Sequence, residues 1–473
     1  MTTHADLVVV GAGSGGFGAA YAAARLGARV VLVEASNGVG GTSTWAGVNN
    51  WEPVAGGTSF PAQLYQALIS TGDACLQRRG CVYHPDRPWG VVRPRSKQHR
   101  LPPQSQSSQR DAYHLRTGAL DRVMRQLLTS AGCDVRLETR FVEVDVDRVG
   151  RRVRAIITQD ATGQRQRLEA DQFIDATADI YLARQAGCQS RVGPESHAEY
   201  DEPSASDAEG VVLNNASPCY RVSPLRESEA PEIEPLPERA DVGLDDLRPV
   251  TSIRTYPNGD LNMNPLHLMT GVEALRLDSE ARAHWHLLQT RHGFYRWRLV
   301  WMSPALGTRE THRLMGRYVL REQDLDAGLA AQSHDDIITF ADHAIYLHGS
   351  RPSRAVSNGP YGVPFRCLLP KELDNLLVAC RGASFSSIGA SSCRLSRTMM
   401  MLGQAAGTAA ALFGLDTAAY VSGDGMSRLQ DQLVTDGVAL TLEEGYLDAM
   451  AGIEPLPQIL EEGASPTIVP QPR

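Results

Sequence analysis

The residues with the clearest chemistry stand near the start of the chain, where three glycines and one acid are spaced for dinucleotide binding. Gly11, Gly13 and Gly16 follow the pattern G-x-G-x-x-G directly after an apolar run. In such a turn the first glycine permits the bend, the second lets the backbone approach a pyrophosphate, and the third lets helix and strand pack closely. Glu34 follows 21 residues after Gly13, where a carboxylate accepts hydrogen bonds from ribose hydroxyls. These residues predict a site for the ADP half of a dinucleotide.

The elements that must position this turn are those of a βαβ unit. Residues 7–10 are apolar and predict a buried strand, residues 17–26 are rich in alanine and predict a helix, and residues 29–34 predict a second strand. The helix N-terminus would direct free N–H groups and a partial positive charge at the phosphates. Without these flanking elements, the same glycine spacing would indicate only a glycine-rich loop in any α/β protein.

Composition limits the classes of function. The 473 residues are enough for two or more domains, and a net charge of −8 argues against a general nucleic-acid or membrane-surface role. No apolar run approaches the roughly 20 residues needed to cross a bilayer. The eight cysteines include no C-x-x-C pair, so no metal site or iron–sulfur cluster is predicted. The first strand begins almost at the N-terminus, which leaves no room for a cleavable signal and makes the cytoplasm the expected location.

Further helix and strand patterns follow along the chain. Helices are expected over residues 61–70, 118–131, 284–298 and 391–412 and from Thr308 onward, and strands over 134–147, 151–159, 167–174 and 375–380. In the helix from Thr308, residues Arg309, His312, Arg313 and Gly316 would share one face. Residues 85–110, rich in Pro, Arg, Ser and Gln, predict an exposed loop, which is either a disordered insert or a basic flap over an anionic substrate.

Four blocks in order resemble the FAD-dependent oxidoreductase family of the glutathione-reductase-like flavoprotein superfamily, which is related to fumarate reductase flavoproteins. The blocks are residues 7–42, the turn 175–179, the arginine block 309–316, and residues 361–407. The resemblance implies an α/β fold: a Rossmann-type FAD-binding domain, with a parallel sheet, helices and a small antiparallel sheet, plus an inserted α+β substrate domain. The expected segments are the FAD-binding domain in 1–60, 113–190 and 359–415, a lid or substrate-side segment in 61–112, the substrate domain in 191–358, and a helical tail in 416–473.

The resemblance also implies which residues hold FAD. The backbone near Val142 would meet the adenine, and the last helix would direct its N-terminus at the N1/C2=O edge of the flavin, where it stabilises the negative charge of the reduced ring. The implied cofactor-binding residues are Gly11, Gly13, Ser14, Gly15, Gly16, Glu34, Ala35, Gly40, Gly41, Thr42, Ser43, Val142, Ala176, Thr177, Asp179, Arg381, Ser391, Ser392 and Arg394. The sequence departs from the family pattern at Ala178 and Cys380, where glycine is usual, and at His312, where serine is more usual.

Missing motifs narrow the chemistry. The redox cysteines of disulfide reductases in this superfamily would stand at Ser43 and Val48, and a second G-x-G-x-x-G for NAD(P)H is absent. Electrons are therefore expected to come from the substrate or from an external donor, and flavin carries the hydride chemistry.

Oxidation of a C–H bond needs a base, and histidine is well matched to that role near neutral pH. His312, which is flanked by Arg309 and Arg313, is the first candidate, with His348 and Tyr361 as alternatives. Arg309 is also a predicted catalytic residue. A lone histidine is more often structural, so a structural role is the commoner alternative for each of these residues. The arginines could bind a carboxylate through a bidentate fork, neutralise FAD phosphates, or form salt bridges at a domain interface. The predicted substrate-binding residues are Arg313, Arg366, Trp45 and Asn49.

The sequence therefore predicts an FAD-dependent oxidoreductase that oxidises a small organic substrate by hydride transfer to flavin N5, with reoxidation by oxygen or an external acceptor. One alternative is a fumarate-reductase-like reductase of an activated C=C bond, in which an arginine donates the proton. Another is a non-catalytic flavin-binding scaffold. The expected partner is a small-molecule substrate, with neither nucleic acid nor membrane, and a homodimer is left open.

Overall fold

The computed structural model describes most of the chain. The described residues are 2–48, 50–51, 58–70, 74–77, 80–83, 90–92, 104–107, 118–205, 213–238, 247, 249–255, 260–265, 277–347 and 354–441.

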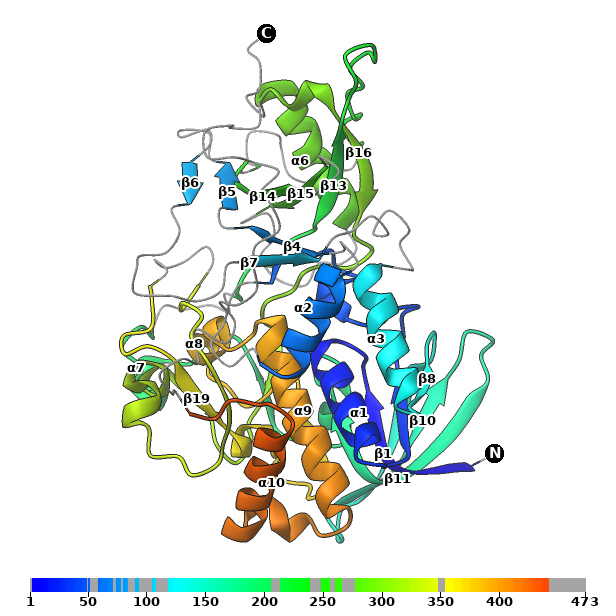
Figure 1. Cartoon of the computed structure of the whole chain (residues 1–473), viewed down its shortest axis with the longest axis vertical. Helices are drawn as coiled ribbons and strands as arrows, with labels where there is room; N and C mark the ends of the chain where they lie inside the picture. The colour runs from blue at the N-terminus through cyan, green and yellow to red at the C-terminus, as the bar shows by residue number, and fades with distance from the viewer. Residues whose placement is uncertain are drawn as a thin grey trace.

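A seven-stranded sheet with a parallel core organises the lower part of the molecule in Figure 1. Its parallel neighbours, in spatial order, are β8 (Asp134–Arg136), β2 (Val30–Val33), β1 (Thr2–Val10), β11 (Arg165–Asp175) and β20 (Leu376–Val378). Two antiparallel strands, β10 (Arg152–Gln159) and β9 (Arg140–Asp147), extend it. The early residues of β11 pair with β10, and its last three pair with β20. The predicted α/β class with a parallel sheet is confirmed.

Helices α1 (Ser14–Arg25) and α9 (Ser396–Phe413) pack against each other beside this sheet, as Figure 1 shows in dark blue and orange. Small residues allow the close approach: a Cβ added at Gly403 would lie 1.9 Å from the carbonyl oxygen of Gly15, and one at Gly407 would lie 2.0 Å from that of Ala19. Gly403 and Gly407 recur at four-residue spacing, so they form a smooth ridge along α9 at this contact.

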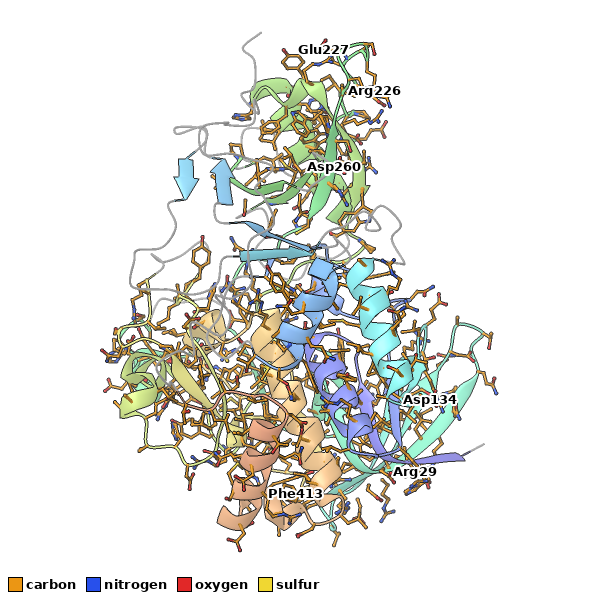
Figure 2. The ribbon with its side chains drawn as sticks, in the orientation of Figure 1. Arg29, Asp134, Arg226, Glu227, Asp260 and Phe413 are labelled. Atoms are coloured by element: carbon orange, nitrogen blue, oxygen red, sulfur yellow. The ribbon has the colours of Figure 1, made fainter. Side chains whose placement is uncertain are left out.

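A second, antiparallel sheet lies in the upper part of Figure 1, next to helix α6 (Leu277–Arg291). Its strands, in spatial order, are β16 (Trp297–Met302), β13 (Tyr220–Pro224), β15 (Leu261–Pro265), β14 (Thr251–Thr255), β5 (Gly80–Tyr83) and β6 (Gly90–Val92). A core that includes Tyr220, Trp285 and Phe294 joins the sheet to α6. Arg221 and Asp260 form a buried ion pair at 2.9 Å within it, with Asp260 labelled in Figure 2. We call this layer the substrate sheet, after the predicted substrate domain (191–358) that contains four of its six strands.

Smaller elements complete the described part of the fold. The remaining strands are β3 (Asn50–Trp51), β4 (Ala74–Gln77), β7 (Gln104–Ser107), β12 (Ser190–Val192), β17 (His312–Leu314), β18 (Ile337–Ala341) and β19 (Tyr361–Pro364). The remaining helices are α2 (Phe60–Ser70), α3 (Ala119–Ser130), α4 (Tyr181–Gln185), α5 (His197–Tyr200), α7 (Glu322–Ala331), α8 (Ser387–Ser392) and α10 (Gly423–Thr435). The short 3₁₀ helices are η1 (Gly41–Ser43), η3 (Phe294–Arg296), η4 (Phe365–Leu368) and η5 (Thr417–Val421). Within the described residues, no helix is long and apolar enough to cross a membrane.

Three helix predictions were wrong. The helix from Thr308 is absent, because residues 312–314 form β17 and pair antiparallel with β12. The helix expected over 284–298 ends at Arg291, since Gly293 adopts a positive φ of 76° and leads into β16. The helix expected over 391–412 is two helices, α8 and α9, separated by the turn at 393–395.

Part of the predicted loop over 85–110 also has another structure. Two short strands lie in it: β6 completes the substrate sheet, and β7 forms a small antiparallel sheet with β3 and β4. The remaining residues of that prediction lie outside the described part of the chain.

Candidate active site

The turn between β1 and α1 has the geometry that its glycine spacing predicts. Gly11 adopts φ +94°, and a Cβ there would lie 2.6 Å from the carbonyl oxygen of Ala176. A Cβ at Gly16 would lie 1.7 Å from the carbonyl oxygen of Gly11, so this residue provides the close helix–strand contact. At Gly13, by contrast, no described atom comes within 4 Å of an added Cβ. The turn is therefore closed at its two outer glycines and open at the middle one, where a pyrophosphate would approach.

The loop at Gly40 and Gly41 forms a second wall beside this opening. The amide of Gly40 donates to the carbonyl of Ala12 at 2.8 Å, and a Cβ added at Gly41 would lie 3.0 Å from the Cα of Gly13. Helix α1 begins here with Gly13 as its N-cap, without a side-chain cap. Its first N–H groups, including those of Ser14 and Gly15, are thus left for an acceptor outside the helix.

Glu34 stands at the end of β2 with its carboxylate over the glycine turn. One carboxylate oxygen accepts from the amide of Ala12 at 2.7 Å, and the other accepts from the amide of Ser36 at 2.8 Å. Each oxygen keeps lone pairs for further donors, such as ribose hydroxyls. The following Ala35 is exposed. Val142 lies in β9, four positions from β2 in the strand order, where β9 shifts register against β10, and its carbonyl accepts from the side chain of Gln185 at 3.1 Å.

The turn after β11 is fixed by a buried acid. The carboxylate of Asp175 accepts from the amide and hydroxyl of Thr177, at 3.0 and 2.8 Å, and from the amide of Ala183 at 2.8 Å. Burial raises the pKa of Asp175 in spite of these hydrogen bonds. The turn also holds Ala178 at φ +67°, a conformation that favours the glycine usual in the family. Ala176, whose carbonyl oxygen faces Gly11, is buried.

Asp179 ends this turn and joins it to two distant segments. Its carboxylate accepts from Arg381 at 2.7 Å and from the hydroxyl of Thr311, and Arg381 also donates to that hydroxyl at 2.7 Å. Burial opposes ionisation of Asp179, but the Arg381 charge and the hydrogen bonds outweigh it and hold the pKa below its usual value. Arg381 is therefore held against protein groups and braces the turn beside Gly11.

The N-terminus of α9 meets the loop that follows Gly41. Ser43 donates to the hydroxyl of Ser396 at 3.0 Å and accepts from the indole N–H of Trp51 at 2.9 Å. Arg397 in the first turn of α9 donates to the carbonyl of Trp51 at 3.0 Å. The N-cap residue of α9, Leu395, offers no side-chain cap. The first N–H groups of α9 are thus available to an acceptor outside the helix, on the same side as the glycine turn. Thr42, in the loop before Ser43, is exposed.

The serines predicted at the start of the last helix belong instead to α8. Ser391 donates to the carbonyl of Ile388 at 2.7 Å, within its own helix. Tyr361 donates to the hydroxyl of Ser392 at 2.7 Å, and Ser392 in turn donates to the carbonyl of His343. Because burial raises the pKa of Tyr361 well above its usual value, this phenol stays protonated and serves the packing of α8.

Because residues 312–314 form the strand β17, the side chains of the arginine block have different surroundings. Arg313 is fully buried and donates to Glu195 at 2.6 Å and to the carbonyl of Phe385 at 2.8 Å, while its Nε lies 3.3 Å from Glu310. Nη2 donates to the carbonyl of Gly193, so both terminal nitrogens are bound to protein acceptors, and these contacts match the salt-bridging alternative for the block. The adjacent His312 is partly exposed, and its Nδ1 atom is buried without a partner among the described residues.

The imidazole of His312 has a lowered pKa. Burial and the charge of Arg184 lower it, and the carboxylate of Asp179 acts in the opposite sense. The ring is therefore neutral near pH 7 and able to accept a proton.

Arg309 has other partners than Arg313. One terminal nitrogen donates to the carbonyl of Asn215 at 2.6 Å and to the hydroxyl of Ser217 at 2.9 Å. Burial and the nearby charge of Arg394 lower the pKa of the Arg309 guanidinium to about 9. Arg394, in the turn between α8 and α9, donates to the carbonyl of Ser391 at 3.1 Å. The structure thus brings two of the predicted arginines together and leaves Arg313 elsewhere.

The other predicted substrate-binding residues have different surroundings. Arg366 forms a bidentate pair with Asp336 at 2.9 and 3.0 Å, so its fork is occupied by a protein carboxylate. Trp45 is partly buried in the loop after η1, close to Gly38. Asn49 and His348 lie outside the described residues. No group of three or more His, Cys, Asp or Glu side chains within the described ranges could hold a metal ion.

Sequence reasoning missed the residues that hold these arginines. Asn215 and Ser217 fix Arg309 from a segment more than ninety residues earlier in the chain. Glu195 pairs with Arg313, and its second oxygen accepts from the amide of Ser387 at the start of α8. Glu195 is 3% exposed, although its segment is rich in polar residues. No local pattern distinguishes it from a surface acid.

The open glycine turn, the acid after β2 and two helix N-termini without side-chain caps define a protein of the Rossmann-type, dinucleotide-binding class. This set of donors and acceptors fits the phosphates and ribose of FAD. The chain belongs to the FAD dependent oxidoreductase family, whose sequence model matches residues 6–433. The cofactor is accordingly FAD, and the protein is a flavoenzyme of the oxidoreductase class. None of the curated proteins matches the sequence.

The chain is similar to several solved structures at low sequence identity. A geranylgeranyl bacteriochlorophyll reductase-like protein from Thermoplasma acidophilum is 11% identical with a TM-score of 0.46, over 93% of this chain and 85% of that one. A myxobacterial chondrochloren halogenase is 12% identical with a TM-score of 0.42, over 91% and 78%. A flavoprotein/dehydrogenase from Cytophaga hutchinsonii is 13% identical with a TM-score of 0.39, over 87% and 78%.

Proposed function

We propose that this chain oxidises a small organic substrate by hydride transfer to flavin N5, followed by reoxidation by oxygen or an external acceptor. The observation that carries the proposal is the N-terminus of α9, which has no side-chain cap and is held beside the glycine turn by the hydrogen bond between Ser43 and Ser396. A helix N-terminus stabilises negative charge, and a flavin that accepts a hydride becomes negatively charged near N1.

Other residues of the chain have matching proposed parts. The amides at Gly13 and Gly41 and the N-terminus of α1 would bind the pyrophosphate, and Glu34 would bind the ribose. The bound FAD supplies the hydride acceptor. The chain must then orient the substrate and accept a proton.

The proposed base is His312, because its imidazole is neutral near pH 7 and its Nδ1 has no partner among the described residues. We expect His312→Gln to lower kcat by about 100-fold or more, in line with general base catalysis. The variant should also lose the acidic limb of the pH profile of kcat/KM while its FAD content is unchanged. A variant that keeps both the rate and the acidic limb would show that His312 is not the base.

The second candidate function is reduction of an activated C=C bond, as in fumarate reductase flavoproteins. It is favoured by Arg309, because burial and Arg394 lower the pKa of its guanidinium to about 9 and make it a stronger acid than an exposed arginine. In this reaction Arg309 would donate the proton.

A stopped-flow experiment separates these functions. Holoenzyme reduced with one equivalent of dithionite is mixed with air-saturated buffer, and separately, without oxygen, with a soluble quinone, fumarate or 2-cyclohexenone. Fast reoxidation by oxygen or the quinone is the expected result. Reoxidation only by fumarate or the enone would favour C=C reduction, and reoxidation by none of them would favour the non-catalytic scaffold.

A further inference from the structure

The guanidinium of Arg309 is held in place but is not neutralised. One terminal nitrogen donates to the carbonyl of Asn215 and to the hydroxyl of Ser217, both neutral groups. Among the residues that the structure describes, no carboxylate lies within salt-bridge distance of Arg309, and its Nε and second terminal nitrogen donate to no acceptor. Arg313, four residues later, shows the contrast, because it pairs with Glu195 and Glu310.

The free donors of Arg309 lie on one edge of the guanidinium. Nε and Nη2 present two parallel N–H groups, and this edge matches the two oxygens of a carboxylate in a bidentate pair. The neutral contacts occupy Nη1 and fix the orientation of the plane. The side chain is thus already oriented for an acceptor that the described protein does not provide.

The surroundings of Arg309 add positive charge. Arg394 is close enough to lower the pKa of Arg309, and the opposing effects come from a thiol and a phenol, Cys219 and Tyr346, not from a carboxylate. A partly buried cation without a counter-ion is costly in free energy, and an anionic ligand would remove that cost.

Arg309 also lies where the substrate sheet meets the FAD-binding elements. Ser217, which holds it, exchanges two backbone hydrogen bonds with Gly307, at 2.9 and 3.2 Å. A Cβ added at Gly307 would lie 3.1 Å from Val48, in the loop that follows Gly41 and Ser43. Arg394 precedes Ser396, the first residue of α9, by two positions. A ligand on Arg309 would therefore be bound beside the elements that hold the flavin.

We propose that Arg309, with Arg394 beside it, binds the carboxylate of the substrate, so that the substrate is a small organic acid. This inference rests on the proposed function in one respect, because it takes the bound acid to be the substrate of the enzyme. The same free edge could instead face a phosphate of FAD itself, and the experiment is designed to separate these two occupants.

The experiment measures binding rather than turnover. Purified holoenzyme is titrated with acetate, propanoate and succinate, and with the corresponding neutral amides, while the visible spectrum of the flavin and the heat of binding are recorded. We expect the carboxylates to bind and the amides to bind at least about tenfold more weakly, because a bidentate charged pair is lost. Equal binding of acids and amides, or no binding of any acid, would overturn the proposal.

Variants assign the binding to Arg309. Arg309→Met should weaken carboxylate binding by about tenfold or more while the affinity for FAD stays within about twofold. Arg309→Lys keeps the positive charge but loses the bidentate fork, so it should bind carboxylates more weakly than the wild type. If Arg309→Met does not fold, Arg309→Lys tests whether residue 309 binds the carboxylate. The control is Arg298→Met, since Arg298 is exposed on the substrate sheet and already pairs with Glu229 at 3.1 Å.

Two results would refute the assignment. Unchanged carboxylate affinity in both Arg309 variants would show that another group binds the acid. A loss of FAD affinity in Arg309→Met, with normal carboxylate binding to the holoenzyme that remains, would assign the guanidinium to the cofactor. Carboxylate binding that depends on Arg309, in an enzyme that fails every redox assay, would reject the proposed oxidation and leave the binding inference standing.

Discussion

Replacing Gly403 by alanine tests whether the α1–α9 contact sets the cofactor site. The added Cβ would lie 1.9 Å from the carbonyl oxygen of Gly15 and 2.7 Å from its carbonyl carbon. Carbon–oxygen contacts are ordinarily about 3.4 Å, so the helices must separate by about 1.5 Å. Overpacking of this kind costs about 1–3 kcal/mol, and we expect about 2–3 kcal/mol here because backbone meets backbone. Since Gly15 is in the first turn of α1, the phosphate donors would move as well.

The measurements are urea denaturation and FAD titration by fluorescence. We expect Gly403→Ala to raise the dissociation constant of FAD by about tenfold or more, since displacements near 1 Å are enough to disrupt a positioned site. Gly423→Ala is the matched control, because an added Cβ there has no described neighbour within 4 Å and the residue begins α10. If the two variants have the same stability and FAD affinity, the close approach of the helices does not set the cofactor site.

Three other predictions concern the turn after β11, the ribose contact and the substrate sheet. Ala178→Gly should raise the free energy of unfolding by about 0.5–1 kcal/mol, because φ is +67° at this residue; a decrease in denaturation midpoint would contradict this. Glu34→Arg should abolish FAD uptake, and Glu34→Gln should retain it more weakly; unchanged titrations in the arginine variant would rule out the ribose contact. His284 is buried between Tyr220 and Thr251, and burial lowers its pKa to about 3. Below about pH 6.5, the imidazole takes up a proton in the unfolded state but not in the folded state. The free energy of unfolding is therefore highest above about pH 6.5 and falls by about 1.4 kcal/mol per pH unit as the pH decreases towards 3. Urea denaturation at pH 7 and 5 should show this slope in the wild type but not in His284→Asn.

The βαβ unit could be predicted because its signals are local. Gly11, Gly13 and Gly16 stand within six residues, and the apolar and alanine-rich runs on either side have lengths typical of a strand and a helix. The packing of α1 on α9 was also predictable in part, since Gly403 and Gly407 recur at helical spacing. The break between α8 and α9 was not, because serine and arginine at 391–397 are compatible with a continuous helix.

The helix predicted for the arginine block was wrong because the surroundings of these residues are not determined by local sequence. A three-residue strand such as β17 is too short to show a period of two, so the spacing of Arg309, His312 and Arg313 matched a helix equally well. Their surroundings depend on distant residues, with Glu195 at one arginine and Ser217 at the other. The sequence thus indicated that the arginines belong to a site. Only the tertiary structure shows that Arg313 is neutralised by carboxylates and that Arg309 is not.

The pairing of β11 has a consequence for how the chain is synthesised. Its last residues, 173–175, complete their hydrogen bonds only with 376–378, and α1 completes its packing only with α9. On the ribosome, the nucleotide-binding half must therefore wait for about two hundred further residues, while its apolar strand edge stays unpaired. We expect nascent chains that stop before residue 376 to depend on chaperones and to aggregate when released, and the native sheet to close only late in translation.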